Sequence, residues 1–150
     1  MKITDTIGLV LKRKGNAKIL SIAPEQSVFE AIGVIAHHDI GALLVLSGEK
    51  LLGILSERDY ARKCALLGHQ SRETLVSEIM TPEVRAVSPL HTVDECMTIM
   101  TDHHIRHLPV IDCDKVVGLV SIGDLVKWVI SDQAQTIQAL EGYISGSYPA

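Results

Sequence analysis

Short runs of apolar residues, separated by polar turns, mark the strands of this chain. Four of these runs form two pairs, and a short polar stretch between the members of each pair predicts a hairpin. The predicted strands span residues 42–46, 51–55, 107–111 and 116–120. A shorter strand is expected ahead of each pair, at 19–22 and 84–87, and a proline follows each of them. Because the runs are almost continuously apolar, we expect sheets that are buried on both faces.

Apolar residues at helical spacing precede each hairpin. These positions are Val28, Ala31, Ile32 and Ile35 in the first half, and Val93, Cys96, Met97 and Met100 in the second. Each helix is expected to begin with a capping box, at 27–30 and 92–95, in which a hydroxyl accepts from the backbone and a glutamate reaches back. A second helix begins at Ser56 or Ser121, and the first of these runs toward Gly68, a plausible helix stop. Each half therefore predicts the order β-α-β-β-α.

The two halves are copies of one another. Residues 19–65 align with 84–130 at an offset of 65 residues without a gap, and eleven positions are identical. Ordinary residue usage gives about three chance identities in such a window. The identical pairs are Pro24 and Pro89, Val28 and Val93, Glu30 and Glu95, His38 and His103, Ile40 and Ile105, Leu43 and Leu108, Val45 and Val110, Lys50 and Lys115, Gly53 and Gly118, Ser56 and Ser121, and Asp59 and Asp124.

An α+β fold follows, in which two β-α-β-β-α repeats pack by pseudo-two-fold symmetry around a shared cleft. One repeat alone has a marginal core, so we expect the two to pack face to face and to form a common core. We divide the chain into an N-terminal helical flank (1–14), a first repeat (15–75), a second repeat (76–131) and a C-terminal helix and tail (132–150).

The two flanks are amphipathic. Ile7 and Leu11 give the first flank an apolar face, and Ile137, Leu140 and Ile144 do so in the second. The pattern leaves open whether the flanks cap the repeats or build a dimer contact. Residues 146–150 are expected to fray.

Composition narrows the functional classes. The 150 residues carry 14 Lys and Arg against 18 Asp and Glu, a net charge of −4, which argues against a nucleic-acid partner. Aromatic residues make up 3% of the chain, so a stacking platform for single strands is not expected. The apolar runs are too short to cross a bilayer, and the N-terminus does not resemble a signal peptide. Three cysteines without a C-x-x-C pair favour a reducing, cytoplasmic setting.

The repeated motifs resemble those of a known family. Each copy carries a proline, then V-x-E, then I-x-x-L-x-V, then a glycine followed by S-x-x-D. This series resembles cystathionine-β-synthase-type (CBS) domains over about residues 15–131, and two in tandem resemble the Bateman module of short, stand-alone proteins. The resemblance implies a regulatory module that binds AMP, ADP, ATP or NAD(H) between the repeats and signals to a protein in trans. It also implies a homodimer shaped as a flat disc.

The same resemblance implies ribose-binding carboxylates. Asp59 and Asp124 would accept the ribose hydroxyl protons, with Ser56 and Ser121 beside them at the helix N-termini. The alternative is that each Ser-x-x-Asp only caps its helix.

Phosphate would be bound by Arg106 and His107, whose positions match the family pattern, and Arg58, inside the Ser56–Asp59 motif, is the other candidate. The adenine would lie against a set of small apolar side chains and backbone groups: Leu20, Ile40, Gly41, Ala42, Met80 and Ile105. The two sites differ, because Gly41 and Ala42 stand where the second repeat has Arg106 and His107. The site at Asp124 would combine its own repeat with backbone at 40–42, and the site at Asp59 would use backbone at 105–107.

Two other functions remain as alternatives. An enzyme is disfavoured, because the paired histidines at 37–38 and 103–104 lack a metal-binding spacing and no nucleophile elbow is present, so we expect neither a metal nor catalysis. A ligand-free structural or protein-interaction module is the second. A sensor of S-adenosylmethionine is a variant of the nucleotide-binding hypothesis.

Overall fold

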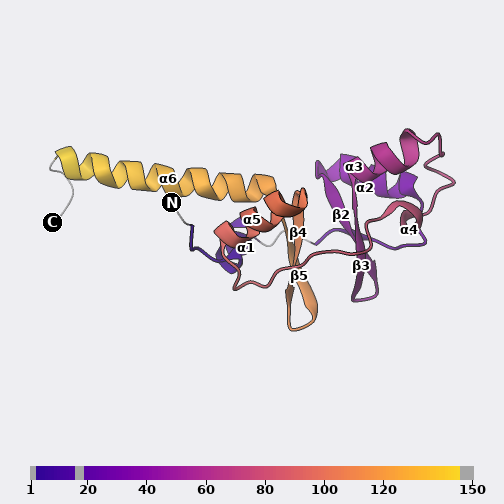
Figure 1. The fold of residues 1–150 in the computed structure, drawn as a ribbon, viewed down its shortest axis with the longest axis horizontal. Coiled ribbons are helices and arrows are strands. Elements are labelled where there is room, and N and C mark those ends of the chain that lie inside the picture. The colour runs from indigo at the N-terminus through magenta and orange to yellow at the C-terminus, as the bar shows by residue number, and fades with distance from the viewer. Residues whose placement is uncertain (1–2, 16–18, 146–150) are drawn as a thin grey trace.

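The chain folds into two similar α+β units that lie side by side, with one long helix extending from the second (Figure 1). The computed structural model describes residues 3–15 and 19–145. Its elements are α1 (Ile7–Lys14), β1 (Ser21–Ile22), α2 (Val28–His38), β2 (Ala42–Ser47), β3 (Lys50–Ser56), α3 (Glu57–Tyr60), the π-helical turn η1 (Ala61–Ala65), α4 (Val76–Ile79), α5 (Val93–His103), β4 (His107–Asp112), β5 (Lys115–Ser121) and α6 (Ile122–Ser145). The expected α+β class with two repeats is confirmed.

The two hairpins are equivalent, but the short strand beside them is not. In the first repeat β1 pairs in parallel with β2, which pairs antiparallel with β3. In the second repeat β4 and β5 form the hairpin, and the expected strand at 84–87 is reduced to one bridge between Val87 and Val110. Val87 donates to the Pro109 carbonyl at 3.0 Å and accepts from Ile111 at 2.8 Å. Because Pro109 has no N–H to donate, the ladder cannot extend from Val87 back toward residue 84.

The helices α2 and α5 begin where the capping pattern predicts. The hydroxyls of Ser27 and Thr92 accept from the third helical N–H, each at 3.1 Å. Glu95 completes the capping box by accepting from the Thr92 N–H at 3.0 Å. Glu30 does not reach back in this way, because its carboxylate accepts instead from the Gln26 amide at 2.7 Å. The box predicted for the first repeat is therefore half formed.

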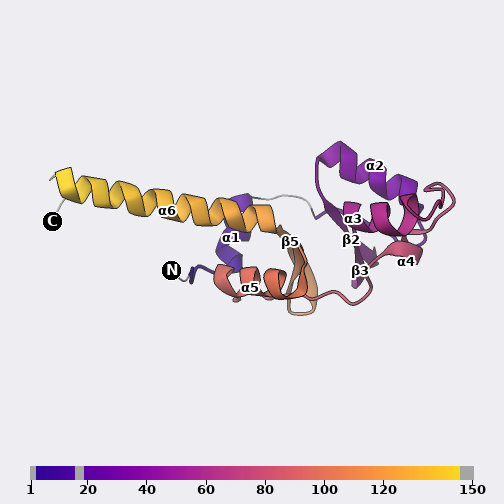
Figure 2. The same ribbon diagram turned by 45° about the horizontal axis from the view of Figure 1, so that its top comes forward.

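A flanking segment of the chain completes each repeat. For the first repeat this segment follows its hairpin, and for the second repeat it is the N-terminal segment. The segment before α4 docks on the first repeat, where Val28 donates to the Thr74 carbonyl at 2.8 Å. The N-terminal segment docks in the same way on the second repeat, where Val93 donates to the Asp5 carbonyl at 2.9 Å. Helix α1 therefore caps the second repeat, although it stands before the first in the sequence (Figure 2).

Each repeat has its own core. The first cluster of buried side chains includes Ile22, Val28 and Leu55, and the second includes Val93, Leu108 and Val120. Ile3, Ile7 and Val10 of the N-terminal segment belong to the second cluster. The expectation of one common core is wrong. Flanking segments cover the apolar face of each repeat, so that neither repeat has to pack on the other to bury it.

Helix α6 joins two elements that the sequence pattern separated. The helix that begins at Ser121 and the C-terminal helix expected from residue 132 form one continuous helix of 24 residues. Its first part is held against α1 and the segment before it, because the Arg13 guanidinium lies 3.9 Å from the centre of the Trp128 ring and the Trp128 indole donates to Asp5 at 2.9 Å. Over residues 3–15 and 19–145, no helix is long and apolar enough to span a membrane. The side chain of Ile144 and residues 146–150 lie outside the described part.

A glycine-to-alanine pair tests the docking of segments on hairpins. A Cβ at Gly53 would lie 2.6 Å from the Thr81 carbonyl oxygen, whereas a Cβ at the exposed helical Gly33 would meet nothing within 4 Å. We expect Gly53→Ala to lower the free energy of unfolding by about 1–3 kcal/mol and Gly33→Ala to raise it by about 0.5–1 kcal/mol. Urea unfolding measures both, and equal effects of the two substitutions would contradict the close packing.

Candidate functional site

A cleft lies between the two repeats, with a cavity of about 700 Å³. That volume is in the usual range for a small-molecule site. From the first repeat the lining includes Leu20, Ile40, Gly41 and Ala42, and from the second His107, Ser121 and Asp124. Lys14 and Lys127 contribute two ammonium groups, and Ile19, Val117 and Leu11 contribute apolar surface. The predicted site at Asp124 is thus brought together from both repeats.

Asp124 is the carboxylate of this cleft. It stands in the first turn of α6, where its Oδ2 accepts from the Ser121 N–H at 2.9 Å and Ser121 Oγ accepts from the Asp124 N–H at 3.1 Å. Lys14 Nζ donates to the same Oδ2 at 3.0 Å and to the Leu119 carbonyl at 3.1 Å. Burial raises the pKa of Asp124, but the hydrogen bonds from Ser121 and the charge of Lys14 outweigh it and hold the pKa below its ordinary value. The carboxylate is therefore ionised at neutral pH.

Asp59 repeats the cap but not the surroundings. Its Oδ2 accepts from the Ser56 N–H and the Ser56 hydroxyl, both at 3.0 Å. Its Oδ1 accepts from Thr81 Oγ1 at 3.2 Å and pairs with Lys63 Nζ at 3.0 Å. Asp59 is 8% exposed and does not line the cleft between the repeats. Each Ser-x-x-Asp is thus a helix cap, and the second is also part of a cavity wall.

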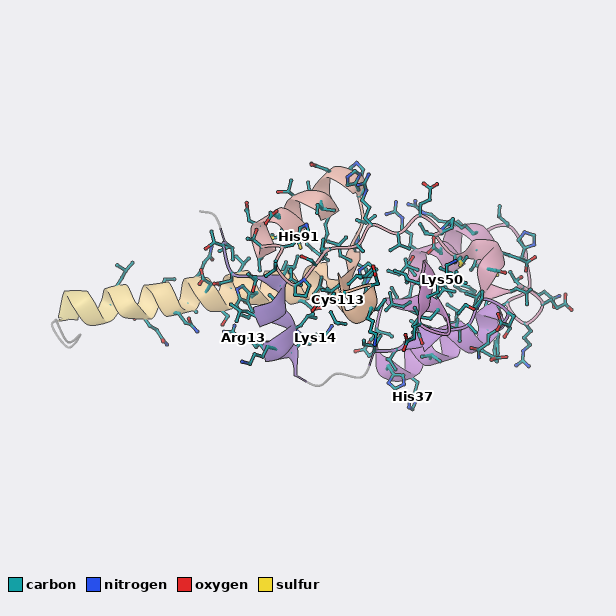
Figure 3. All side chains as sticks on the ribbon, turned by 90° about the horizontal axis from the view of Figure 1, so that it is seen from below. Arg13, Lys14, His37, Lys50, His91 and Cys113 are labelled. Carbon is teal, nitrogen blue, oxygen red and sulfur yellow. The ribbon has the colours of Figure 1, made fainter. Side chains whose placement is uncertain are left out.

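The cations of the cleft differ from those expected. Arg58 and Arg106 are exposed and are not among the lining residues. Lys14 and Lys127 line the cleft instead. Lys127 follows Asp124 by three residues, so helical spacing alone places both on one face of α6. No signal in the sequence indicated Lys14, because it reaches the cleft only through the docking of α1 on the second repeat (Figure 3).

His107 lies in the cleft wall opposite Gly41. A Cβ on Gly41 would be 3.3 Å from two atoms of the imidazole ring, so a glycine makes room for the ring there. Burial lowers the pKa of His107, and the charges of Lys14 and Arg106 act in the same direction, against Asp124. A neutral ring results at neutral pH. It can donate one hydrogen bond to a ligand but adds no positive charge.

Two residues expected near the adenine lie elsewhere. Met80 packs under β3, where its Sδ would be 3.0 Å from a Cβ on Gly53. Ile105 packs against the core of the second repeat.

The paired rings of His37 and His38 lie edge to face with centroids 5.0 Å apart, and only His38 of this pair lines the cleft. Among the described residues, no group of three or more histidines, cysteines or carboxylates is placed to hold a metal ion.

The lowered pKa of His107 predicts a loss of stability in mild acid. Because its ordinary value is 6.5 and the folded value is lower, the unfolded chain takes up this proton first as the pH falls, and folding becomes less favourable. We expect the free energy of unfolding to fall from pH about 7.5 to about 5.5, and to fall less in His107→Gln. Urea unfolding at the two pH values measures this, and equal pH dependence of both proteins would contradict it.

Comparison with known proteins identifies the family. The family model described as "CBS domain" matches residues 15–65 and 76–131. The CBS domain-containing protein CBSX3, mitochondrial, of Arabidopsis thaliana is 40% identical over 151 residues, which cover 95% of this chain and 73% of that protein.

Solved structures share the fold. The CBS-domain protein NE2398 is 48% identical with a TM-score of 0.80, covering 83% of this chain and 97% of its own. The CBS domain pair of protein MJ0100, solved in complex with 5′-methylthioadenosine and S-adenosyl-L-methionine, is 26% identical with a TM-score of 0.72, covering 87% and 99%. The two repeats are CBS domains, and the chain belongs to the family of CBS-domain proteins.

Proposed function

We propose that this chain is a non-catalytic regulatory module that binds an adenosine-containing ligand in the cleft at Asp124 and signals its occupancy to a protein in trans. The observation that carries the proposal is an ionised carboxylate in a cavity to which both repeats contribute. The binding of S-adenosyl-L-methionine and 5′-methylthioadenosine by the related MJ0100 pair supports the ligand class. The AMP, ADP, ATP or NAD(H) expected from the motifs are the phosphate-bearing members of that class.

The groups of the cleft suit the parts of a nucleoside. Asp124 would accept the ribose hydroxyl protons, and all its described contacts are made by Oδ2, so Oδ1 keeps its accepting capacity. Lys14 would have to share or release Oδ2 when a hydroxyl approaches. The ammonium groups of Lys14 and Lys127 would meet phosphate oxygens. Adenine would lie on Leu20, with its edge toward the backbone at 40–42.

Occupancy would be transmitted through α1. Lys14 is the last residue of that helix, and its neighbour Arg13 donates to Ser131 on α6 at 3.2 Å and stacks on Trp128. A ligand that takes Asp124 from Lys14 therefore loosens one of the contacts that join α1 to α6. Coupling energies of this kind are typically about 1–3 kcal/mol. The helices α1 and α6 would be the elements through which a partner senses the ligand.

The remaining expectations stay predictions. A second ribose at Asp59 and Ser56 would have to displace Thr81 or Lys63, since both oxygens of Asp59 are already engaged. Phosphate binding by Arg58 and Arg106 would require these exposed side chains to turn toward the ligand. The flat-disc homodimer, the partner in trans and the cytoplasmic setting belong to the same group of predictions. A ligand-free interaction module is the competing function.

A thermal-shift panel with AMP, ADP, ATP, NAD, NADH and S-adenosylmethionine tests the proposal. A ligand at 100 times its dissociation constant adds about 2.7 kcal/mol of stability. We expect at least one member to raise the melting temperature of the wild type, and Asp124→Asn to lose most of that shift while Asp59→Asn keeps it. Absence of any shift favours the interaction module. Equal shifts in both variants would place the ligand away from Asp124.

Lys127 distinguishes phosphate-bearing from uncharged ligands. Hydrogen bonds to charged groups contribute about 1.5–3 kcal/mol, so Lys127→Met should weaken ADP or ATP binding by roughly ten-fold or more. The affinity for 5′-methylthioadenosine, which has no phosphate, should not change. Lys115→Met is the matched control, because Lys115 is an exposed cation of the distant hairpin turn. Isothermal titration measures both affinities, and equal losses for the two ligands would remove Lys127 from the phosphate site.

A further inference from the structure

Lys14 gives the carboxylate of the cleft a cation from its own chain. It is the last residue of α1 (Figure 3), and its Nζ lies 3.0 Å from Asp124 Oδ2. The same Nζ donates to the Leu119 carbonyl at 3.1 Å. The Lys14 side chain is 39% exposed and that of Asp124 is 18% exposed. The carboxylate is thus largely withdrawn from water, and its charge is compensated by the ammonium group.

The first repeat builds the same arrangement from a local lysine. Lys63 Nζ lies 3.0 Å from Asp59 Oδ1 and donates to the Ile79 carbonyl at 3.2 Å. That lysine follows its carboxylate by four residues. The corresponding position of the second repeat is Trp128, and the cation comes instead from α1, 110 residues before Asp124. Of the two ion pairs, the one at Asp124 therefore joins two separate elements and lies in the cleft wall.

A ligand that separates this pair has to satisfy two groups of different chemistry. Asp124 needs hydrogen-bond donors, and the neutral hydroxyls of a ribose can supply them. Lys14 needs acceptors, because an ammonium group carries three donors and no acceptor. A hydroxyl oxygen accepts a hydrogen bond but brings no negative charge, whereas a phosphate oxygen does both. A ribose alone thus replaces one half of the pair and leaves the charge of Lys14 without a counter-ion.

The other charged groups of the cleft favour an anion as well. The charged side chains of the lining are Lys14, Lys127, Asp39 and Asp124. Lys127 lies three residues after Asp124 in α6 and so shares its face of the helix. His107 adds no charge, because burial keeps its pKa below the ordinary value. A ligand whose ribose meets Asp124 therefore finds two ammonium groups within the same cavity.

We propose that the Lys14–Asp124 ion pair makes the cleft selective for adenosine ligands that carry a 5′-phosphate over uncharged adenosine derivatives. The ribose takes Asp124 and the phosphate takes Lys14, so both halves of the pair gain a new partner in one event. The hydrogen bond to the Leu119 carbonyl can persist, because it uses one of three donors. An uncharged nucleoside instead competes with Lys14 for the carboxylate. This inference rests on the proposed function, because it concerns how that ligand is chosen.

Replacement of Lys14 tests the selectivity, because it should change the affinities of two matched ligands in opposite directions. Adenosine and AMP differ only in the 5′-phosphate. In Lys14→Met the competing ammonium group is gone, so adenosine should bind about three-fold more tightly, as expected for a partly exposed ion pair. AMP loses a charge-assisted hydrogen bond and should bind about three-fold or more weakly, even with that gain included. Isothermal titration of the full chain measures both affinities.

Two further variants separate competition from simple loss of charge. Lys12→Met is the matched control, because Lys12 is an exposed lysine in the same last turn of α1, and both affinities should stay as in the wild type. Lys127→Met should weaken AMP alone. Changes of the same sign for adenosine and AMP in Lys14→Met, or no change, overturn the selectivity and leave the proposed function standing. AMP binding that is absent from the wild type, or unchanged in Asp124→Asn, overturns both.

Discussion

The close approach of a chain segment to each hairpin is the constraint on which the rest of the structure depends. Gly53 and Gly118 stand at the same point of the two hairpins, and a Cβ there would contact Thr81 and Leu11 at 2.6 Å and 2.8 Å. The missing side chains let the two flanking segments lie directly on β3 and β5. On the second repeat this contact fixes α1, and with it the ammonium group of Lys14 beside Asp124. The position of Lys14 in the cleft wall is thus set by the packing of Leu11 on Gly118, about one helical turn earlier in α1.

The two carboxylates show how two copies of one motif come to have different surroundings. Both begin as the same cap, a Ser-x-x-Asp at a helix N-terminus. Asp59 is then saturated by Lys63 and Thr81, which belong to its own repeat and its linker. Asp124 has neither of these two partners. Its cation, Lys14, comes from the N-terminal segment instead. One carboxylate therefore lies in the wall of the cleft, while the other is enclosed by side chains that hold its own repeat together.

Sequence reasoning reached the elements that local chemistry determines. The duplicated pattern predicted both hairpins, the caps of α2 and α5, and the cleft residues Ser121 and His107. It failed where contacts with a distant part of the chain determine the local structure. The strand at 84–87 is ended by Pro109 on another strand, Lys14 reaches the cleft through tertiary docking, and Met80 is drawn under Gly53. Sequence reasoning also missed that the helix beginning at Ser121 and the helix expected from residue 132 form one continuous helix, because no residue there interrupts it.

The docking of the N-terminal segment on the second repeat has a consequence for biosynthesis. Asp5 and its partner Trp128 are 123 positions apart, so the apolar side chains next to Asp5 can be buried only after the second repeat has been made. At about 5–20 residues per second, a ribosome needs roughly 6–25 s to reach Trp128 after Asp5. During that interval Ile3, Ile7 and Val10 have no core to enter, while the first repeat can already fold behind them. The apolar side chains of the N-terminal segment therefore stay exposed on the nascent chain until the second repeat has been made.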